Sequence, residues 1–173
     1  MNSATDIPQT ISLIGMPGAG KSTVGVILAK LLGRQFRDTD LEIQRRERAT
    51  LHEILDRRGY QALRKIEEEV LLKIALEDAI ISTGGSAVYS EASMQRLQEA
   101  GPVVYLKADL QTLAPRVAAT PNRGIASSKE RSFAEVYGER TPLYSQHATL
   151  TVDATNGTAD DVAMTIARQL CDQ

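Results

Sequence analysis

Short apolar runs alternate along the chain with longer segments in which apolar residues recur at helical spacing. The short runs predict five strands, at residues 11–14, 35–38, 79–82, 103–106 and 149–152. Helical spacing predicts helices at residues 21–32, 41–78 with a break near Gly59, 90–100, 110–118, 133–146 and 159–170. Ser90 is the expected cap of the third of these, and Thr158 with Asp161 forms a capping box before the last.

Most of the predicted strands are followed by a helix. This alternation implies right-handed βαβ crossovers and a mainly parallel sheet with helices on both faces. We therefore expect an α/β fold around five strands, and we expect ligand-binding residues just beyond the carboxyl ends of those strands.

Composition and charge narrow the classes of function. The 173 residues suit one domain, and 42% apolar with 24% charged residues is typical of a globular chain. Twenty basic residues against 22 acidic ones give a net charge of −2, which argues against nucleic acid as a partner. We expect a monomer that binds a small-molecule substrate.

Cellular location is predicted from what the sequence contains. Cys171 is the single cysteine, which suits a reducing compartment. Residues 1–9 are polar and read as a flexible N-terminus rather than a secretion signal, and apolar runs of about 18 residues do not occur. These features predict a cytoplasmic protein that is not inserted in a membrane.

A glycine-rich segment lies between the first predicted strand and the helix after it. Residues 15–22 read Gly-Met-Pro-Gly-Ala-Gly-Lys-Ser, which fits G-x-x-x-x-G-K-[ST]. Backbone N–H groups around Gly18 and Gly20 would hold phosphate oxygens at the positive end of the helix dipole. Lys21 would reach the β- and γ-phosphates, and the Ser22 hydroxyl would bind Mg²⁺. The motif predicts a P-loop NTPase-like fold of the nucleoside monophosphate kinase type.

The nucleotide is expected to be ATP. Guanine-specific P-loop proteins carry an Asn-Lys-x-Asp segment, and none of Asn2, Asn122 and Asn156 begins one. The chain is also short for a motor or transporter ATPase, so a small-molecule kinase fits its size. Its expected ATP-binding residues in the loop and the following helix are Gly18, Ala19, Gly20, Lys21, Ser22 and Thr23.

Two aspartates stand at the carboxyl end of the second predicted strand. Asp38 and Asp40 lie two residues apart, so in extended backbone their side chains would share a face. One could hold the water shell of a metal ion while the other accepts a hydroxyl proton. The alternative is a pair of solvated aspartates that cap a helix.

Several segments together resemble the shikimate kinase family, and the resemblance covers nearly the whole chain. They are residues 15–23, Asp38-Thr39-Asp40, Leu63-Arg64-Lys65-Ile66-Glu67-Glu68, Ser82-Thr83-Gly84-Gly85 and Arg140-Thr141-Pro142-Leu143-Tyr144. The resemblance implies an enzyme of aromatic amino acid biosynthesis that transfers the γ-phosphate of ATP to the 3-hydroxyl of shikimate.

The resemblance also implies roles for individual residues around the acceptor. Asp40 would bind ring hydroxyls and stand nearest the attacking oxygen, while Asp38 would support magnesium together with Ser22. Arg64 and Arg140 would clamp the carboxylate, since a planar guanidinium suits bidentate recognition. Gly85 would offer its backbone to the ring.

Two further arginines are implied on the ATP side. Arg123 would come from a mobile lid at about residues 119–132 and approach the phosphates, where its charge would act in the transition state. Arg116 would stack on adenine. Lys21, Asp38, Asp40 and Arg123 are thus the expected catalytic residues.

The chain departs from the family pattern mainly around the acceptor pocket. Ser86 stands where a third glycine is usual, Tyr60 replaces a glutamate, and Leu63 replaces an aromatic residue. Gln44 replaces an acid, and the lid reads Arg-Gly-Ile-Ala at residues 123–126. Two alternatives therefore stand beside shikimate kinase: a kinase of another small hydroxy acid such as homoserine or gluconate, and a nucleotide-binding protein without catalysis.

Overall fold

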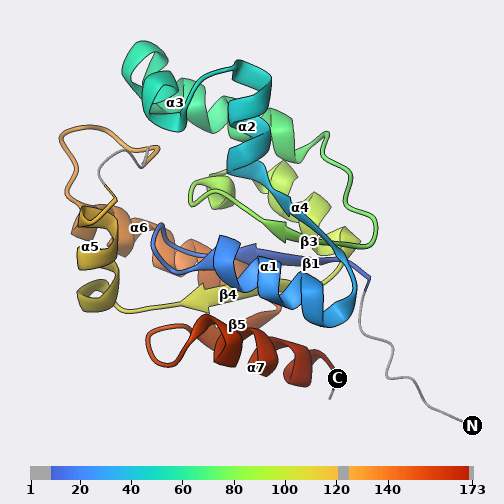
Figure 1. Cartoon of the computed structure of the whole chain (residues 1–173). Coiled ribbons are helices and arrows are strands. Elements are labelled where there is room, and N and C mark those ends of the chain that lie inside the picture. Colours follow the sequence, from blue (N-terminus) through green and yellow to red (C-terminus); the bar gives the residue numbers. More distant parts are fainter. Residues whose placement is uncertain (1–8, 121–124, 172–173) are drawn as a thin grey trace, which may run out of the picture.

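The computed structural model describes residues 9–120 and 125–171. Strands and helices alternate along the chain (Figure 1). In order they are β1 (Ile11–Ile14), α1 (Lys21–Leu32), β2 (Gln35–Asp38), α2 (Thr39–Glu47), α3 (Leu51–Leu71), β3 (Ala79–Ser82), the 3₁₀ turn η1 (Ala87–Tyr89), α4 (Glu91–Ala100), β4 (Val103–Lys107), α5 (Leu110–Ala118), α6 (Phe133–His147), β5 (Leu150–Asp153) and α7 (Ala159–Cys171).

The sheet is parallel throughout, with strand order β2-β3-β1-β4-β5. The strands β1 and β3 are buried along their full length, as continuous apolar runs in a covered parallel sheet should be. Helices α1 and α7 pack against one another, and α6 packs on β4. Figure 1 shows α1 and α7 in front of the sheet, with α4 and α6 behind it. The expected three-layer α/β fold is confirmed.

The strand order creates a crevice at the carboxyl end of the sheet, between β1 and β3. From β1 the chain passes through α1 toward β2, whereas from β3 it passes through α4 toward β4, in the opposite direction. Right-handed crossovers in opposite directions place their helices on opposite faces. The segments that follow β1 and β3 therefore part at the carboxyl end of the sheet, where ligands bind in folds of this kind.

Helices α2 and α3 form a separate layer above that crevice, with a small apolar core of their own (Figure 1). The predicted break at Gly59 is present, since this residue has φ +80° inside α3. A second break was not predicted. Arg48 adopts φ +52°, and Thr50 forms a capping box with Glu53 that starts α3. The 41–78 segment is thus two helices, and it ends at Leu71.

The remaining predicted elements agree closely with the structure. Ser90 caps α4 by accepting from the Ser93 N–H, and Thr158 exchanges hydrogen bonds with Asp161 at the start of α7. Strand β5 lies one residue later than predicted, and the short η1 turn was not predicted. No helix within residues 9–120 or 125–171 is long and apolar enough to cross a bilayer.

Two helical glycines test how tightly the layers pack. A Cβ at Gly25 in α1 would lie 2.6 Å from the Phe36 ring of β2, whereas one at Gly138 in α6 would meet no described atom within 4 Å. We expect Gly25→Ala to lower the free energy of unfolding by about 1–2 kcal/mol through overpacking. Gly138→Ala should raise it by about 0.5–1 kcal/mol, because alanine restricts the unfolded chain. Urea unfolding measures both, and equal effects would contradict the close approach of α1 to β2.

Candidate active site

The turn from β1 to α1 needs glycine at several positions. Gly18 and Gly20 adopt φ of +88° and +90°, a region that side chains disfavour. At Gly15 a Cβ would lie 2.7 Å from the Leu106 carbonyl oxygen of β4. The Ala19 N–H donates to the Met16 carbonyl (3.1 Å) and closes the turn.

The N-terminus of α1 is left open and positive. Gly20 occupies the N-cap without any side-chain cap, and the first turn, which includes Thr23, has no acidic residue. Lys21 is 6% exposed and its Nζ donates to the carbonyls of Gly15 (2.8 Å) and Met16 (3.0 Å). Uncapped N–H groups and a buried ammonium together suit phosphate binding.

Ser22 and Asp38 meet although they are 16 residues apart. The Ser22 hydroxyl donates to Asp38 Oδ2 (2.5 Å) and lies 3.3 Å from the Ser82 hydroxyl. All three groups are hard oxygen donors beside the phosphate loop. Mg²⁺ is typically held by one or two carboxylates, with substrate phosphates and water completing its shell. The Ser22–Asp38 pair therefore fits the expected metal site, and no larger cluster of metal-binding side chains occurs in the described chain.

Asp38 and Asp40 do not share a face as extended backbone would require. The chain turns into α2 at Thr39, and Asp38 is the N-cap, with Oδ1 accepting from the N–H groups of Asp40 (2.9 Å) and Leu41 (3.4 Å). This corrects the geometric part of the prediction. The Asp38 carboxylate accepts from Ser22, whereas Asp40 lines a pocket that Ser22 also borders and Asp38 does not, so the two carboxylates have different surroundings.

That pocket lies between the P-loop, α2–α3 and the segment after β3. Its polar lining includes Lys21, Asp40, Glu67, Ser86 and Arg140. Gly84 lies in the wall of this pocket. A Cβ at Gly84 would overlap Glu67 Oε1 and would lie 2.9 Å from Asp40 Oδ1, so both carboxylates come close to the glycine backbone. Two carboxylates thus approach one another across a glycine.

Glu67 was part of the quoted motif, but sequence reasoning gave it no role. It is 4% exposed; Oε2 accepts from the Ser86 hydroxyl, and Oε1 has no hydrogen-bond partner among the described residues. Burial, reinforced by the Asp40 carboxylate, raises the pKa of Glu67 to about 7, against the opposing effects of Ser86, Arg140 and Lys21. The only available signal was its position three residues after Arg64 on one helix.

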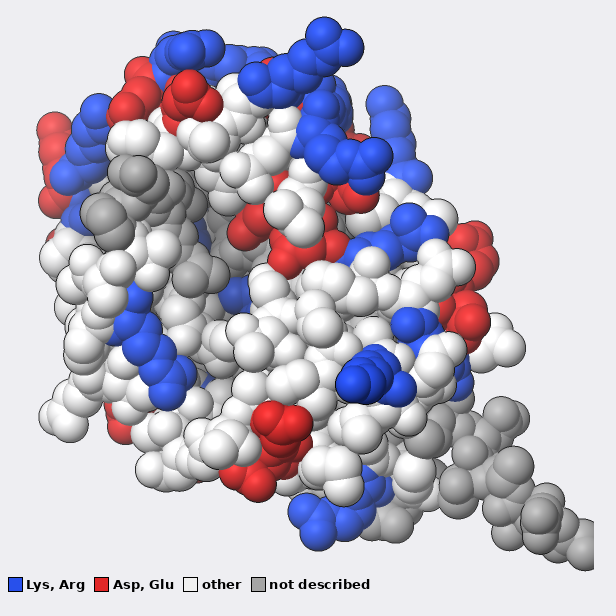
Figure 2. Space-filling model, viewed as in Figure 1, with Lys and Arg blue, Asp and Glu red and all other residues white. Residues whose placement is uncertain are grey.

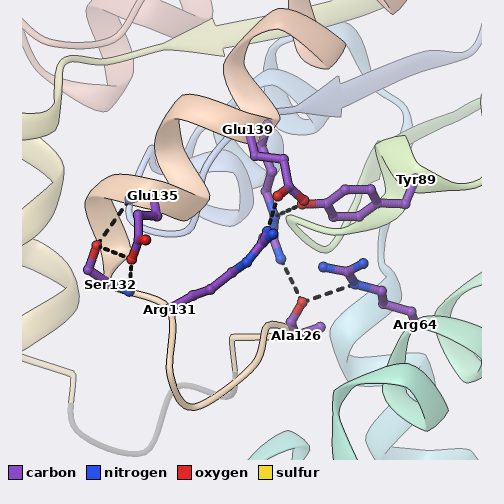
Figure 3. Close-up of polar contacts among 8 residues, drawn as sticks. Arg64, Tyr89, Ala126, Arg131, Ser132, Glu135 and Glu139 are labelled. Carbon is purple, nitrogen blue, oxygen red and sulfur yellow. Dashed lines mark hydrogen bonds and ion pairs between the residues drawn. The ribbon is translucent and has the colours of Figure 1, made fainter.

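Arg64 and Arg140 come from α3 and α6 and meet at one carbonyl (Figure 3). Arg64 Nε and the Arg140 guanidinium donate to the Ala126 oxygen, at 3.1 and 2.8 Å. Arg140 is 1% exposed, yet among the described residues neither arginine is paired with a carboxylate. Two adjacent unpaired guanidiniums suit a bidentate carboxylate ligand.

Gly85 lies beside this pair. A Cβ there would come within 3.0 Å of Arg140 Nη1 and 2.9 Å of Pro17 Cδ, so a side chain would crowd both the P-loop and the arginine. The Tyr144 hydroxyl donates to the Gly85 carbonyl (2.5 Å). The Tyr144 ring stacks on the Tyr105 ring, with 5.1 Å between the ring centroids. The backbone at Gly85 is therefore held by the buried face of α6.

A second cavity, of about 250 Å³, opens on the other side of the P-loop. Arg116 lines it and donates to the Gly18 carbonyl (3.3 Å). The segment between β5 and α7 supplies the remaining wall, chiefly Ala154 and Gly157, which sequence reasoning did not identify. Arg116 thus lies beside a space next to the phosphate loop, while Arg123 falls outside the described residues.

The viewed face of the molecule carries mixed charge. Figure 2 shows acidic and basic side chains interspersed over the upper α2–α3 layer, and a hollow beneath it with basic atoms at its floor. The hollow lies on the side of the sheet where the P-loop and α2–α3 face each other (Figure 1).

Comparisons with known proteins agree with this geometry. A family model described as shikimate kinase matches residues 17–171. The shikimate kinase of Nitrosospira multiformis is 34% identical over 163 residues, covering 92% of this chain and 84% of that protein. The Thermobifida fusca shikimate kinase is 38% identical over 161 residues, covering 91% and 92%. A structure of shikimate kinase from Acinetobacter baumannii in complex with shikimate has a TM-score of 0.89 at 32% identity, covering 99% of this chain and 98% of that one.

The raised pKa of Glu67 makes stability depend on pH. Below the unfolded-state pKa near 4.5 both states are protonated; between there and about 7 only the unfolded state releases the proton, so folding is disfavoured progressively. Glu67→Gln should therefore gain stability relative to the parent as pH rises from 4.5 to 7.5, by on the order of 3 kcal/mol. Urea unfolding across this range measures the difference. Glu68→Gln is the matched control, and the same pH dependence in both variants would contradict the assignment.

Proposed function

The chain belongs to the shikimate kinase family, and we propose that its site transfers the γ-phosphoryl group of ATP to the 3-hydroxyl of shikimate, a step of aromatic amino acid biosynthesis. One observation supports this most directly. The open, positive helix N-terminus, Asp40 and Arg140 all line one pocket. Arg64 reaches its wall through the Ala126 carbonyl, which accepts from both arginines, and neither guanidinium forms an ion pair with a carboxylate of the described residues. The pocket thus offers a phosphate site, a carboxylate site and a group that can accept a proton.

ATP is the phosphoryl donor, and we assign its triphosphate to the P-loop. The backbone from Gly18 to Ser22 and the first turn of α1 would hold phosphate oxygens, with Lys21 neutralising charge on the β- and γ-phosphates. The cavity beside Arg116 and Gly157 continues from this loop, which supports placing the adenine there. Arg123 remains a predicted phosphate-binding residue.

Mg²⁺ is assigned to the Ser22–Asp38 pair, where it would neutralise charge on the phosphates. The chain's own contribution there is to orient the ligands. Asp38 is held by two N–H groups of α2 through Oδ1, which leaves Oδ2 directed at Ser22. The start of α2 therefore fixes the carboxylate that would receive the metal.

The acceptor would bind with its carboxylate at Arg64 and Arg140 and its hydroxyls toward Asp40 and Glu67. Glu67 Oε1 has no described partner and borders the same space as Asp40 Oδ1, so both oxygens can accept from hydroxyl groups. Two fixed ends, one cationic and one anionic, leave a small hydroxy acid with a single preferred orientation.

In the transfer itself the acceptor hydroxyl oxygen forms a bond to the γ-phosphorus as the bond from that phosphorus to the β-bridging oxygen breaks. The hydroxyl proton passes to Asp40, and ADP leaves with the electron pair of the broken bond. Catalysis rests on positioning and on Lys21 near the developing charge, since phosphoryl transfer demands little covalent chemistry from the protein. We place this reaction in the cytoplasm and expect a monomer.

The test of the function is a coupled ADP-release assay with MgATP and each of shikimate, homoserine and gluconate. Turnover on shikimate alone is expected. Turnover on another hydroxy acid alone would contradict the proposed acceptor while leaving the phosphoryl transfer intact. If none of the three acceptors causes ADP release, catalysis is contradicted and a nucleotide-binding protein without catalysis is favoured.

Two substitutions separate the roles within the site. Asp40→Asn should lower kcat at least about 100-fold with the fold intact, because the amide cannot take the hydroxyl proton.

Arg64→Ala should raise KM for the acceptor by about 100-fold and leave KM for ATP within about twofold, because a charge-assisted carboxylate contact is lost. Arg57→Ala, an exposed arginine of the same helix that pairs with Glu53, is the control. An equal rise in both KM values for Arg64→Ala would argue against the clamp.

A further inference from the structure

Tyr89 reaches between the two arginines that bind the acceptor carboxylate. It ends the short turn η1, which follows the pocket wall at residues 83–86 and lies against α3, α4 and α6. Those contacts bring one ring from η1 to Arg64 of α3 and to Arg140 of α6 (Figure 3). The proposed function gives Tyr89 no role, and sequence reasoning did not single it out.

The two guanidiniums pose an electrostatic problem in the absence of ligand. Burial lowers the pKa of Arg64, and the neighbouring positive charge of Arg140 lowers it further. Their shared acceptor, the Ala126 carbonyl, is neutral. Among the described residues no carboxylate forms a direct ion pair with either arginine. The charge of Glu67 raises the pKa of Arg64 by less than Arg140 lowers it, so Glu67 offsets only part of the repulsion and leaves both guanidiniums available to a ligand.

The ring and the hydroxyl of Tyr89 offset this repulsion further, at two different points. The Arg64 Cζ atom lies 3.7 Å from the Tyr89 ring centroid, well within the distance of a cation–π interaction. The ring of Tyr60 is farther from Arg64, at 5.1 Å. The Tyr89 hydroxyl accepts from Arg140 Nε (3.3 Å) and donates to Glu139 Oε1 (2.5 Å).

The Glu139 carboxylate acts on Arg140 indirectly, through the Tyr89 hydroxyl that lies between them. Its other oxygen pairs with Arg131, which ties the start of α6 to the same network (Figure 3). A carboxylate placed directly on Arg140 would compete with the carboxylate of an acceptor. A phenol between Glu139 and Arg140 instead transmits part of that charge through a polarised hydroxyl and leaves the guanidinium free to bind.

We propose that Tyr89 is a positioning residue of the acceptor site, which holds Arg64 through its ring and Arg140 through its hydroxyl so that the two guanidiniums present one carboxylate-binding surface. This inference rests on the proposed function and adds a specificity determinant to it. Tyr89 acts through the arginines, so removing it should weaken recognition of the carboxylate and leave nucleotide binding unchanged.

Two substitutions at Tyr89 separate the contributions of hydroxyl and ring. Tyr89→Phe keeps the ring and should raise KM for shikimate about fivefold, whereas Tyr89→Leu removes both contacts and should raise it about 50-fold. KM for ATP should stay within twofold in both variants. Tyr137→Phe is the matched control, since it removes a hydroxyl one turn before Arg140 that has no hydrogen-bond partner among the described residues.

The methyl ester of shikimate distinguishes positioning from general packing. In the parent enzyme, esterification should raise KM at least about 30-fold, because the arginines lose their anionic partner. In Tyr89→Leu the same change should raise KM less than about threefold, because substitution and esterification remove the same interaction. An ester penalty as large in Tyr89→Leu as in the parent would overturn the proposal. So would an equal rise in KM for ATP, or an unchanged KM for shikimate.

Calorimetric titration of shikimate and its ester into the same variants measures binding without turnover. It therefore tests the role of Tyr89 independently of the proposed function. A parent protein that binds shikimate through its carboxylate without phosphorylating it would contradict the proposed function, and the dissociation constants would still decide the role of Tyr89. A parent that shows no preference for the acid over the ester would contradict the positioning role itself.

Discussion

The parallel pairing of β1 with β3 is the constraint on which the site depends. In this register Leu13 lies opposite Ser82, and its carbonyl accepts from both the N–H (3.2 Å) and the hydroxyl (2.9 Å) of Thr83. The P-loop begins two residues after Leu13, and the glycine wall of the acceptor pocket begins one residue after Thr83. Two hydrogen bonds at a single carbonyl thus hold the P-loop beside the glycine wall, and with it the proposed phosphate site beside the proposed acceptor site.

Around that junction the protein buries charged groups that form no direct ion pair among the described residues. Arg140 and Glu67 are 1% and 4% exposed. Such groups are unfavourable for folding unless hydrogen bonds hold them, and here the Ala126 carbonyl, the Tyr89 hydroxyl and the Ser86 hydroxyl do so. Because these hydrogen-bond partners are neutral, the charges stay directed toward the proposed substrate site, an arrangement that favours electrostatic catalysis.

A feature could be predicted from the sequence when the residues that form it are close together along the chain. The strands, most helix boundaries and the P-loop were predictable because periodicity, caps and the glycine motif all lie within a few neighbouring residues. The start of α3 was readable in the same way from the capping box of Thr50 and Glu53, and was missed. Asp38 and Asp40 were predicted as site residues, but their different orientations depend on α2 beginning at Thr39, which spacing alone does not show. Glu67 and Tyr89 acquire their chemistry only from burial and from partners 19 to 51 residues away.

The proposed phosphate site and the proposed acceptor site also differ in how far apart in sequence their residues lie. Backbone groups and residues adjacent in sequence make up most of the phosphate site, so one short motif contains nearly all of it. Side chains from α2, α3, residues 83–86, η1 and α6 surround the proposed acceptor site, and two of them, Ser86 and Tyr89, contact its charged residues directly. A substitution at either position can change how Glu67, Arg64 or Arg140 is presented while every motif residue stays in place. If the site works as proposed, the choice among small hydroxy acids depends on the neighbours of the binding residues, whereas the P-loop motif determines only that a phosphoryl group is transferred.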